Sequence, residues 1–250
     1  MCTLVLLRRP GHDWPLLVGA NRDELVERPW LPPARHWPDR AHVVAGLDLQ
    51  AGGTWLGLND YGVVAAVLNR RHSLGGAPDK RSRGELVLEA LDHATADDAS
   101  EALGDLDARA YRPFNLVIAD RVSAWWLRGL GDAGDGKVGI FPLPPGLSFF
   151  TSSDRNDTEA SARTRHYLPA FEAATPPSPE AGDWSAWEHL FQSELRSGDD
   201  PNGAMLIRSD WGYGTVSSAF LALPAAPDRR PVWRFAGRGK VLQPYESIDI

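Results

Sequence analysis

The sequence predicts an α+β protein with antiparallel sheets. Apolar runs typical of strands fill the first part of the chain, helical patterns fill much of the middle, and strands close it. Neighbouring strands are separated by short turns such as Pro10–Asp13, not by the crossover helices that parallel strands require. No repeat or linker interrupts the pattern, so we expect a single domain over residues 1–250.

The first part of the chain reads as strands. Apolar runs at Thr3–Leu7 and Leu16–Asn21 flank the turn residues and predict an opening hairpin. A loop rich in proline and tryptophan follows over residues 28–39. Gly62 can adopt positive φ without steric cost, which suits a turn between two later strands. These two strands are expected at residues 54–58 and 63–68, and a further strand is expected at residues 43–47.

Helical patterns mark the middle of the chain. Ser82 and Glu85 have the spacing of a capping box, and Leu86, Leu88 and Leu91 follow at loosely helical intervals. Further helices are expected at 96–106, 157–174 and 184–195, and further strands at 115–119, 123–127, 138–141, 147–150, 215–223 and 232–236.

Composition narrows the functional classes. The formal net charge of −7 opposes binding to phosphate backbones, so no nucleic-acid partner is expected. Neither a signal peptide nor an apolar run of roughly 20 residues is visible, which predicts a cytoplasmic protein without a membrane span. Cys2 is the one cysteine, which excludes an internal disulfide, and the histidine spacings suggest no metal site. The oligomeric state stays open.

Cys2 is the first candidate for chemistry. Removal of Met1 would leave a thiol and a free α-amine on one residue. The amine has a reference pKa of about 7.7–8.0 and the thiol one of about 8.5, so the amine can accept the thiol proton near neutral pH. Such a residue is both nucleophile and base, and needs an acid to orient the amine and donors for the oxyanion. The simpler interpretation is a small apolar residue that starts a strand.

Four polar or charged residues, Asn21-Arg22-Asp23-Glu24, follow directly on an apolar strand. We expect them at a sheet end, where functional groups collect. Asp23 could hold the α-amine of Cys2, and Arg22 could favour a thiolate or bind a substrate carboxylate. Because alternate strand residues face opposite sides, Asp23 should serve the Cys2 site while Arg22 and Glu24 anchor the neighbouring loop. The alternative is a charged turn paired in solvent.

Asn69 ends another apolar strand. Its side-chain amide is an uncharged donor suited to an oxyanion hole. The alternative interpretation is a residue that simply forms a turn at a strand end.

Taken together, these segments resemble the NRDE family, the transport-and-Golgi-organisation relatives, which is named for the tetrad at residues 21–24. The similarity covers most of the chain in order. It includes Met1-Cys2, Ala20–Glu24 with Arg28-Pro29, Ala45–Asp48, Gly52–Gly57, Leu68-Asn69, Arg83–Val87, Phe114–Leu116 and, more weakly, Tyr213–Thr215.

The same frame is similar to cysteine N-terminal-nucleophile hydrolases of the bile-salt hydrolase and penicillin V acylase type. The resemblance rests on Met1-Cys2-Thr3, Gly19-x-Asn21-x-Asp23 and Val67-Leu68-Asn69. It implies that Cys2 is nucleophile and base, that Asp23 anchors the amine and that Asn69 donates to the oxyanion. It also implies a four-layer αββα sandwich of two antiparallel sheets.

Three positions depart from these patterns. The arginine of the hydrolases falls on Ala20, and Arg22 stands two positions further on. A downstream asparagine expected at Thr151-Ser152-Ser153 is missing, and Asn156 lies three residues beyond. The arginine of the family's Tyr-Gly-Thr-Arg reads Val216. Each missing donor would cost a few kcal/mol of transition-state stabilisation.

Two functions therefore stand side by side. The first is an amidohydrolase that cleaves a non-peptide C–N bond of a small-molecule amide through a Cys2 thioester, with no cofactor. The second is a non-catalytic carrier that uses the same pocket for a hydrophobic ligand, namely haem or an acyl-CoA or lipid. Under either function Asn21, Arg22 and Trp55 are candidate ligand contacts. Trp55 belongs to a set of tryptophans near the site that suit an apolar pocket, namely Trp14, Trp30, Trp37 and Trp55.

Overall fold

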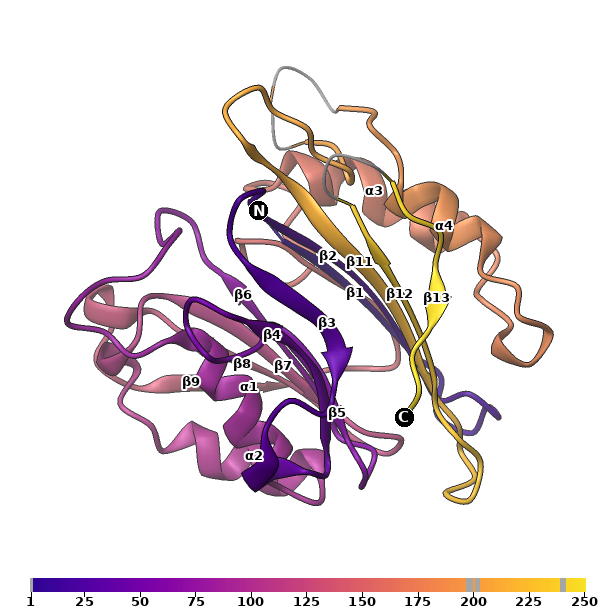
Figure 1. Cartoon of the computed structure of the whole chain (residues 1–250), viewed down its shortest axis with the longest axis horizontal. Helices are drawn as coiled ribbons and strands as arrows, with labels where there is room; N and C mark the ends of the chain where they lie inside the picture. The colour runs from indigo at the N-terminus through magenta and orange to yellow at the C-terminus, as the bar shows by residue number, and fades with distance from the viewer. Residues whose placement is uncertain (1, 197–199, 201–202, 239–241) are drawn as a thin grey trace. The chain divides into compact units, whose positions relative to one another are not determined.

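The computed structural model describes residues 2–196, 200, 203–238 and 242–250, so Met1 lies outside the described residues. The chain divides into two compact units, each built on one sheet (Figure 1). The first unit comprises Met1–Arg28 and Pro145–Ile248, and the second comprises Pro29–Pro144 with Asp249–Ile250. The single domain over residues 1–250 stays a prediction.

The first unit is built on an antiparallel sheet. Its described strands are β1 (Thr3–Arg8), β2 (Leu16–Leu25), β10 (Gly146–Phe150), β11 (Tyr213–Leu223), β12 (Val232–Gly237) and β13 (Glu246–Ser247). They pair in the order β10-β1-β2-β11-β12-β13. The β1–β2 pair is the predicted opening hairpin, with Thr3 opposite Asn21 and Arg8 opposite Leu16.

β2 is longer than the sequence suggested. The predicted strand ended at Asn21, but pairing with β11 continues to Leu25, which lies opposite Tyr213. Asn21, Arg22 and Asp23 are buried within this strand, so the alternative of a charged turn in solvent is wrong. These residues did not predict a strand from the sequence, because their side chains are polar. In the structure the side chains of Asn21 and Asp23 bind polar groups of the same unit and do not pack in an apolar core.

Helices α3 (Ala162–Ala173) and α4 (Ser185–Phe191) cover this sheet in the first unit (Figure 1). Both begin later than predicted, and α4 ends four residues earlier. A cluster of aromatic side chains joins them to the strands, with Phe171 packed edge-on against Trp187 and Phe191. Residues of the cluster that are at most 2% exposed include Trp14, Phe149, Phe171, Trp184, Trp187, Phe191 and Phe220.

The second unit is a meander of antiparallel strands. Its described strands are β3 (Trp30–Ala34), β4 (Val43–Asp48), β5 (Leu56–Asn59), β6 (Val64–Asn69), β7 (Phe114–Ala119), β8 (Ala124–Gly129) and β9 (Val138–Pro142). They pair in chain order. The prediction of a loop over residues 28–39 is wrong for Trp30–Ala34, which form β3. This strand holds two prolines and sits at the sheet edge, where a missing N–H group costs no ladder bond.

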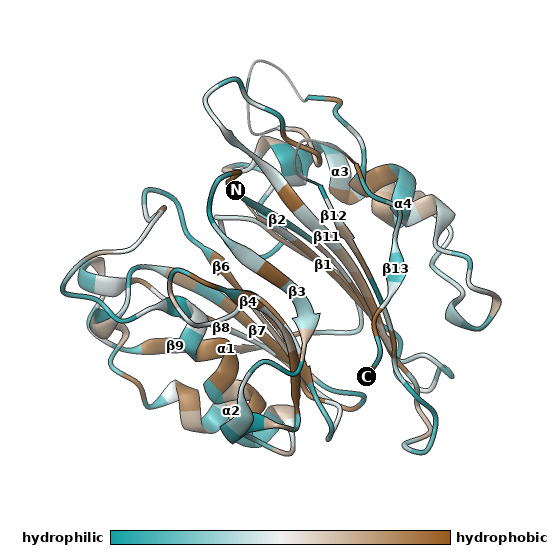
Figure 2. Cartoon of the chain, viewed as in Figure 1, coloured by the Kyte–Doolittle hydropathy of each residue, from teal (hydrophilic) through white to brown (hydrophobic). Residues whose placement is uncertain are grey.

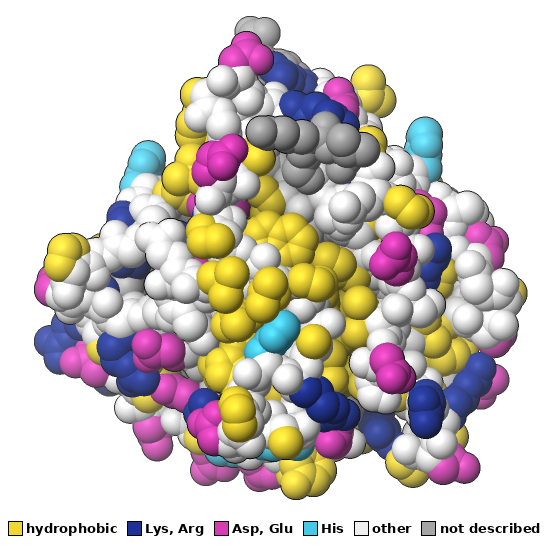
Figure 3. Space-filling model, in the orientation of Figure 1, with side chains coloured by type: hydrophobic (Ala, Val, Ile, Leu, Met, Phe, Trp, Pro, Cys, Tyr) yellow, Lys and Arg dark blue, Asp and Glu magenta, His cyan; other side chains and the backbone are white. Residues whose placement is uncertain are grey.

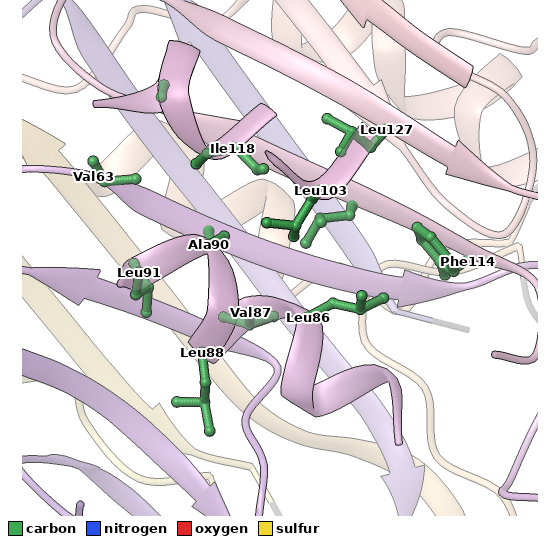
Figure 4. Close-up of a cluster of buried hydrophobic side chains, with 14 of the residues drawn as sticks. Val63, Leu86, Val87, Leu88, Ala90, Leu91, Leu103, Phe114, Ile118 and Leu127 are labelled. Atoms are coloured by element: carbon green, nitrogen blue, oxygen red, sulfur yellow. The ribbon is translucent and has the colours of Figure 1, made fainter. Parts of the chain in front are cut away.

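Helices α1 (Arg83–Leu91) and α2 (Ala96–Gly104) pack on the sheet of the second unit. Figure 4 shows the apolar side chains that meet there, among them Leu86, Val87 and Phe114, which are fully buried. The hydroxyl of Ser82 caps α1, as predicted, by accepting from the N–H group of Gly84. In a full capping box the Glu85 carboxylate would accept from the N–H group of Ser82. Among the described bonds of Glu85, its carboxylate binds the guanidinium of Arg81 instead.

Two glycines make the close approach of α1 to the sheet possible. A Cβ on Gly53 would lie 2.6 Å from the carbonyl carbon of Gly84, and one on Gly84 would lie 2.9 Å from the nitrogen of Thr54. The N–H group of Thr54 also donates to the Gly84 carbonyl at 3.2 Å. Two sequence blocks about thirty residues apart, at 52–57 and 83–87, thus form one structural feature.

Figure 2 shows hydrophobic residues concentrated in the strands and on the helices of both units. Four short 3₁₀ helices connect the described elements, at Pro38–Arg40, Ala108–Ala110, Gly131–Ala133 and Pro179–Ala181. On the face seen in Figure 3, basic and acidic side chains are intermixed. None of the helices in the described residues is long and apolar enough to span a membrane.

Candidate active site

Cys2 lies immediately before β1, an interior strand of the first unit's sheet. Its side chain is partly buried, and the thiol donates to the main-chain carbonyl of Asp23 across 3.6 Å. Thr3 pairs with Asn21 in the β1–β2 register, so one further step brings Cys2 opposite Arg22. The structure therefore brings together Cys2 and the charged residues of β2.

The Asp23 carboxylate is buried and fixed from two sides. Its Oδ1 atom accepts from the hydroxyl of Thr215 at 2.7 Å, and its Oδ2 atom accepts from Nη1 of Arg163 at 3.1 Å. The N–H group of Ile207 donates to the Thr215 hydroxyl at 2.9 Å, so the hydroxyl proton is directed at Asp23. Arg163 and Asp23 form an ion pair in which both side chains are 0% exposed.

Arg163 also binds the strand that carries the nucleophile. The same Nη1 atom donates to the hydroxyl of Thr3, the residue after Cys2. One guanidinium from the first turn of α3 thus bridges β1 and β2 at the end where Cys2 lies.

Tyr213 shares an acceptor with the Cys2 thiol. Its hydroxyl donates to the main-chain carbonyl of Asp23 at 3.2 Å, and its ring stacks on Trp211 with centroids 5.0 Å apart. Burial raises the pKa of Tyr213, and the negative charges of Asp23 and Cys2 raise it further. The phenol therefore stays a neutral donor at physiological pH.

The electrostatics of the Cys2 thiol combine opposing effects. Burial raises the pKa of the thiol, and the neighbouring Asp23 carboxylate raises it as well. The charge of the N-terminal amine, the hydrogen bond to the Asp23 main chain and the positive charge of Arg22 lower the pKa, but they do not offset the rise. In the chain that still carries Met1, the neutral thiol is therefore favoured.

The position of Arg22 differs from our expectation. Residues directly opposite each other in an antiparallel pair face the same side, so Arg22 shares a face with Cys2. Arg22 is 5% exposed, and its charge acts on the thiol. It therefore does not serve only the neighbouring loop. Glu24 does meet that loop, since its carboxylate lies 3.9 Å from the guanidinium of Arg28.

Asn21 is buried on the helix side of the sheet. Its Nδ2 atom donates to the carbonyls of Phe191 at 3.0 Å and Met205 at 2.9 Å, and its Oδ1 atom accepts from Ser218. These bonds fasten the end of α4 and the segment before β11 to β2. They give Asn21 a structural use, and a contact with substrate stays a prediction.

Asn69 and Trp55 belong to the second unit. Asn69 ends β6, as the sequence indicated, and pairs there with Phe114 of β7. The indole of Trp55 lies over Gly46, where a Cβ would come within 2.4 Å of the ring, and its edge meets Trp30. Their roles at the Cys2 site stay predictions.

Asn156 does not supply the missing downstream asparagine. Its Oδ1 atom accepts from the N–H group of Phe149 at 2.6 Å, and its Nδ2 atom donates to the Leu147 carbonyl at 3.3 Å. Both side-chain atoms thus bind the main chain of β10. The backbone of Asn156 is left-handed, with a φ of 54°. Val216, at the position of the missing arginine, is buried at an irregularity in the β2–β11 pairing.

Sequence reasoning missed Arg163 and the roles of Tyr213 and Thr215. The last two lay in a block noticed only as a weak similarity, and Arg163 lay in a predicted helix with no signal of function. Nothing in the local sequence indicates that α3 crosses the sheet at Asp23.

Comparison with solved structures shows the fold to which these elements belong. The chain resembles the Caenorhabditis elegans N-acylethanolamine-hydrolyzing acid amidase ortholog with a TM-score of 0.57 and 14% identity, covering 91% of this chain and 94% of that one. It resembles a mutant of the conjugated bile acid hydrolase from Clostridium perfringens with a TM-score of 0.57 and 11% identity, covering 100% and 92%. The predicted fold class, α+β with the two antiparallel sheets of N-terminal-nucleophile hydrolases, is confirmed.

The sequence defines the family more closely. Residues 1–137 match the family described as Transport and Golgi organisation 2, and the chain belongs to this family. It is 37% identical over 111 residues to the Transport and Golgi organization 2 homolog of Mus musculus, and 36% identical over 116 residues to the corresponding protein of Homo sapiens. These matches cover 42% and 44% of this chain but only 38% and 40% of the relatives' length.

Proposed function

We propose that this chain is a cytoplasmic N-terminal-nucleophile cysteine amidohydrolase that cleaves a non-peptide C–N bond of a small-molecule amide. The observation that carries the proposal is the hydrogen bond from the Cys2 thiol to the main-chain carbonyl of Asp23, whose carboxylate Arg163 and Thr215 hold in place. The fold supports it, since the two solved structures named above bear the names of amide-cleaving hydrolases. In this proposal residues 1–250 act as one catalytic domain.

The reaction begins once Met1 has been removed. The α-amine of Cys2 takes the thiol proton, and the thiolate attacks the amide carbonyl to form a tetrahedral oxyanion. As the intermediate collapses, the ammonium group returns a proton to the departing nitrogen, the C–N bond breaks and a thioester remains on Cys2. Water then attacks the thioester with the amine as base, which releases the carboxylic acid and restores the thiol.

The other residues have distinct roles. Asp23 orients the amine, and its own position is fixed from behind by Arg163 and Thr215. Arg22, on the Cys2 side of β2, favours the thiolate and binds an anionic group of the substrate. The predicted oxyanion donor is Asn69 and a predicted substrate contact is Trp55. Asn21 holds the end of β2, because its amide binds the carbonyls of Phe191 and Met205 on the helix side of the sheet.

Hydrolysis of N-acyl amides by protein that begins at Cys2 tests the proposal. A panel of acyl groups and amines would be incubated with the protein, amine release would be measured, and rapidly quenched samples would be weighed for an acyl adduct. We expect turnover with at least one amide, an adduct on Cys2, and loss of both in Cys2→Ser and Cys2→Ala.

The carrier hypothesis gives a different result in the same experiment. Protein that turns over no amide, forms no adduct, and binds haem or acyl-CoA equally well as wild type and as Cys2→Ala would contradict the hydrolase. Equal amide turnover by wild type and Cys2→Ala would also contradict it, because the reaction would not pass through the thiol.

A further inference from the structure

Arg163 makes more contacts at the site than fixing the Asp23 carboxylate requires. Its guanidinium is fully buried, binds the carboxylate of Asp23 and also binds the hydroxyl next to the nucleophile, on Thr3. A buried ion pair is an inefficient way to stabilise a fold, because desolvation of both charges cancels much of their attraction. The contacts of Arg163 therefore suggest a role in the chemistry of Cys2, the residue next to Thr3.

We propose that Arg163 is a positioning residue that shares the Asp23 carboxylate with the α-amine of processed Cys2 and keeps that amine unprotonated at neutral pH. This inference rests on the proposed function. It concerns how the base of that reaction is maintained, not which amide is cleaved.

The physical argument begins with the carboxylate. A carboxylate that orients an amine also stabilises its protonated form, and so raises the pH at which the amine becomes a base. The reference pKa of an α-amine, about 7.7–8.0, already lies above neutrality, so Asp23 alone would hold the amine as an ammonium ion. A cation bound to the same carboxylate opposes this effect and favours the neutral amine.

The contacts at Asp23 are compatible with a carboxylate shared between Arg163 and the amine. The carboxylate accepts from Arg163 on Oδ2 and from Thr215 on Oδ1, and each oxygen has a second acceptor position. A carboxylate can accept more than one hydrogen bond on each oxygen, so the bond from Arg163 is compatible with a further one from the amine. Because Arg163 also holds Thr3, the guanidinium fixes the backbone that carries the amine with respect to the carboxylate.

Other charged or titratable groups of the described residues also face the site. Arg22 of β2 lies on the Cys2 side of the strand, where it acts on the thiol. Tyr213 of β11 is held neutral, and Glu24, whose charge also acts on Tyr213, lies near Arg28. Arg163 of α3 is a cation in direct contact with the carboxylate.

The test is the pH dependence of Cys2 alkylation in protein that begins at Cys2, confirmed by mass. Alkylation reports the coupled thiol and amine, and removal of a nearby cation raises the pKa of both groups. In Arg163→Gln the apparent midpoint should rise by roughly one pH unit, and the rate below the midpoint should fall about tenfold. Arg163→Lys should restore most of the shift.

Arg165→Gln is the matched control. Arg165 lies on the same helix, is exposed and binds only carbonyls of the preceding turn among its described contacts, so its replacement should leave the midpoint unchanged. Asp23→Asn provides a second background in case Arg163→Gln folds poorly. The midpoint of Asp23→Asn should fall, and adding Arg163→Gln should raise it again.

The outcomes separate the two proposals. A reactive wild-type thiol whose midpoint is the same with and without Arg163, in both backgrounds, would overturn this inference and leave the hydrolase intact. That result would make Arg163 a structural partner of Asp23. A wild-type thiol that is inert at every pH would overturn the proposed function itself, and this inference with it.

Discussion

The two units bury different kinds of side chain between sheet and helices. In the second unit the contact of α1 and α2 with the strands is a continuous apolar cluster (Figure 4). In the first unit an aromatic cluster fills one part, and charged groups fill another. Of the buried charged residues in the described parts of the chain, Asp48 belongs to the second unit, and four belong to the first, namely Arg22, Asp23, Arg163 and Arg238.

This difference indicates that the buried charges of the first unit are not explained by folding alone. Buried charges are costly unless they are paired, and apolar side chains of similar size would stabilise the same contact at least as well. Asp48 has a local explanation, because its carboxylate accepts from the N–H groups of Gln50 and Ala51 in a turn. Arg22, Asp23 and Arg163 lie at the end of β2 nearest Cys2, which is where the proposed chemistry needs them.

The largest effect should come from breaking the buried pair of the first unit. Asp23→Leu leaves the guanidinium of Arg163 buried without its carboxylate, and should lower the free energy of unfolding by about 3–5 kcal/mol in urea titrations. The double variant Asp23→Leu/Arg163→Met should recover most of this loss, because no charge is left uncompensated. Equal stability of the single and double variants would show that the two charges are not coupled.

The apolar core of the second unit should respond by a different mechanism. Leu86→Ala removes a fully buried side chain and leaves a cavity, and should cost about 3 kcal/mol. Leu74→Ala, at a 45% exposed leucine of the same unit, is the control and should change stability by less than about 0.5 kcal/mol. A second substitution at a charged residue should not restore the stability lost in Leu86→Ala.

The glycine contact in the second unit should give a smaller effect. Gly53→Ala forces a Cβ against the main chain of Gly84, and should destabilise the protein by about 2 kcal/mol through displacement of α1. Gly76→Ala meets nothing within 4 Å and serves as the control. Thermal unfolding of the two variants would measure the difference, and equal melting temperatures would refute the close contact.

Asp48→Ala should have the smallest effect of the set. It removes two hydrogen bonds of one turn and should cost about 1 kcal/mol, measured in the same urea titrations. A loss comparable to that of Asp23→Leu would remove the distinction drawn here between the charges of the two units.

Much of the fold could be predicted because local patterns suffice for it. Alternating and apolar runs located every strand described between Thr3 and Leu68 except β3, and Ser82 correctly marked the start of α1. β3 was missed because prolines suppress the strand signal, although a sheet edge tolerates them. The full length of β2 was missed because its last residues are polar on both faces.

The candidate site could be predicted only in part. Cys2 and Asp23 were recognisable because position 2 and the tetrad are distinctive in sequence, and the structure brings these two residues into contact. Arg163 was not, because its role depends on where α3 crosses the sheet, 140 residues after Asp23. The bonds that commit Asn156 to β10 are likewise visible only in three dimensions.

The pH dependence of the unprocessed chain follows from the raised pKa of the Cys2 thiol. With Met1 in place, burial and Asp23 favour the neutral thiol, so the thiolate fraction at pH 7 is below that of an exposed cysteine. Alkylation by iodoacetamide should therefore be slow at pH 7 and should gain rate only above the ordinary thiol pKa of about 8.5. A midpoint below that value in this form would contradict the electrostatics described above.

The central claim, that Cys2 is an activated nucleophile once its amine is free, is tested most directly by the rate of this alkylation at pH 7 before and after removal of Met1. Intact mass would identify each form, and an unfolded control would give the rate of an exposed cysteine. We predict that protein beginning at Cys2 reacts faster than the unfolded control, that the chain carrying Met1 reacts more slowly than it, and that Asp23→Asn changes the rate of the processed form. A processed protein whose thiol stays as inert as that of the unprocessed chain would contradict the claim.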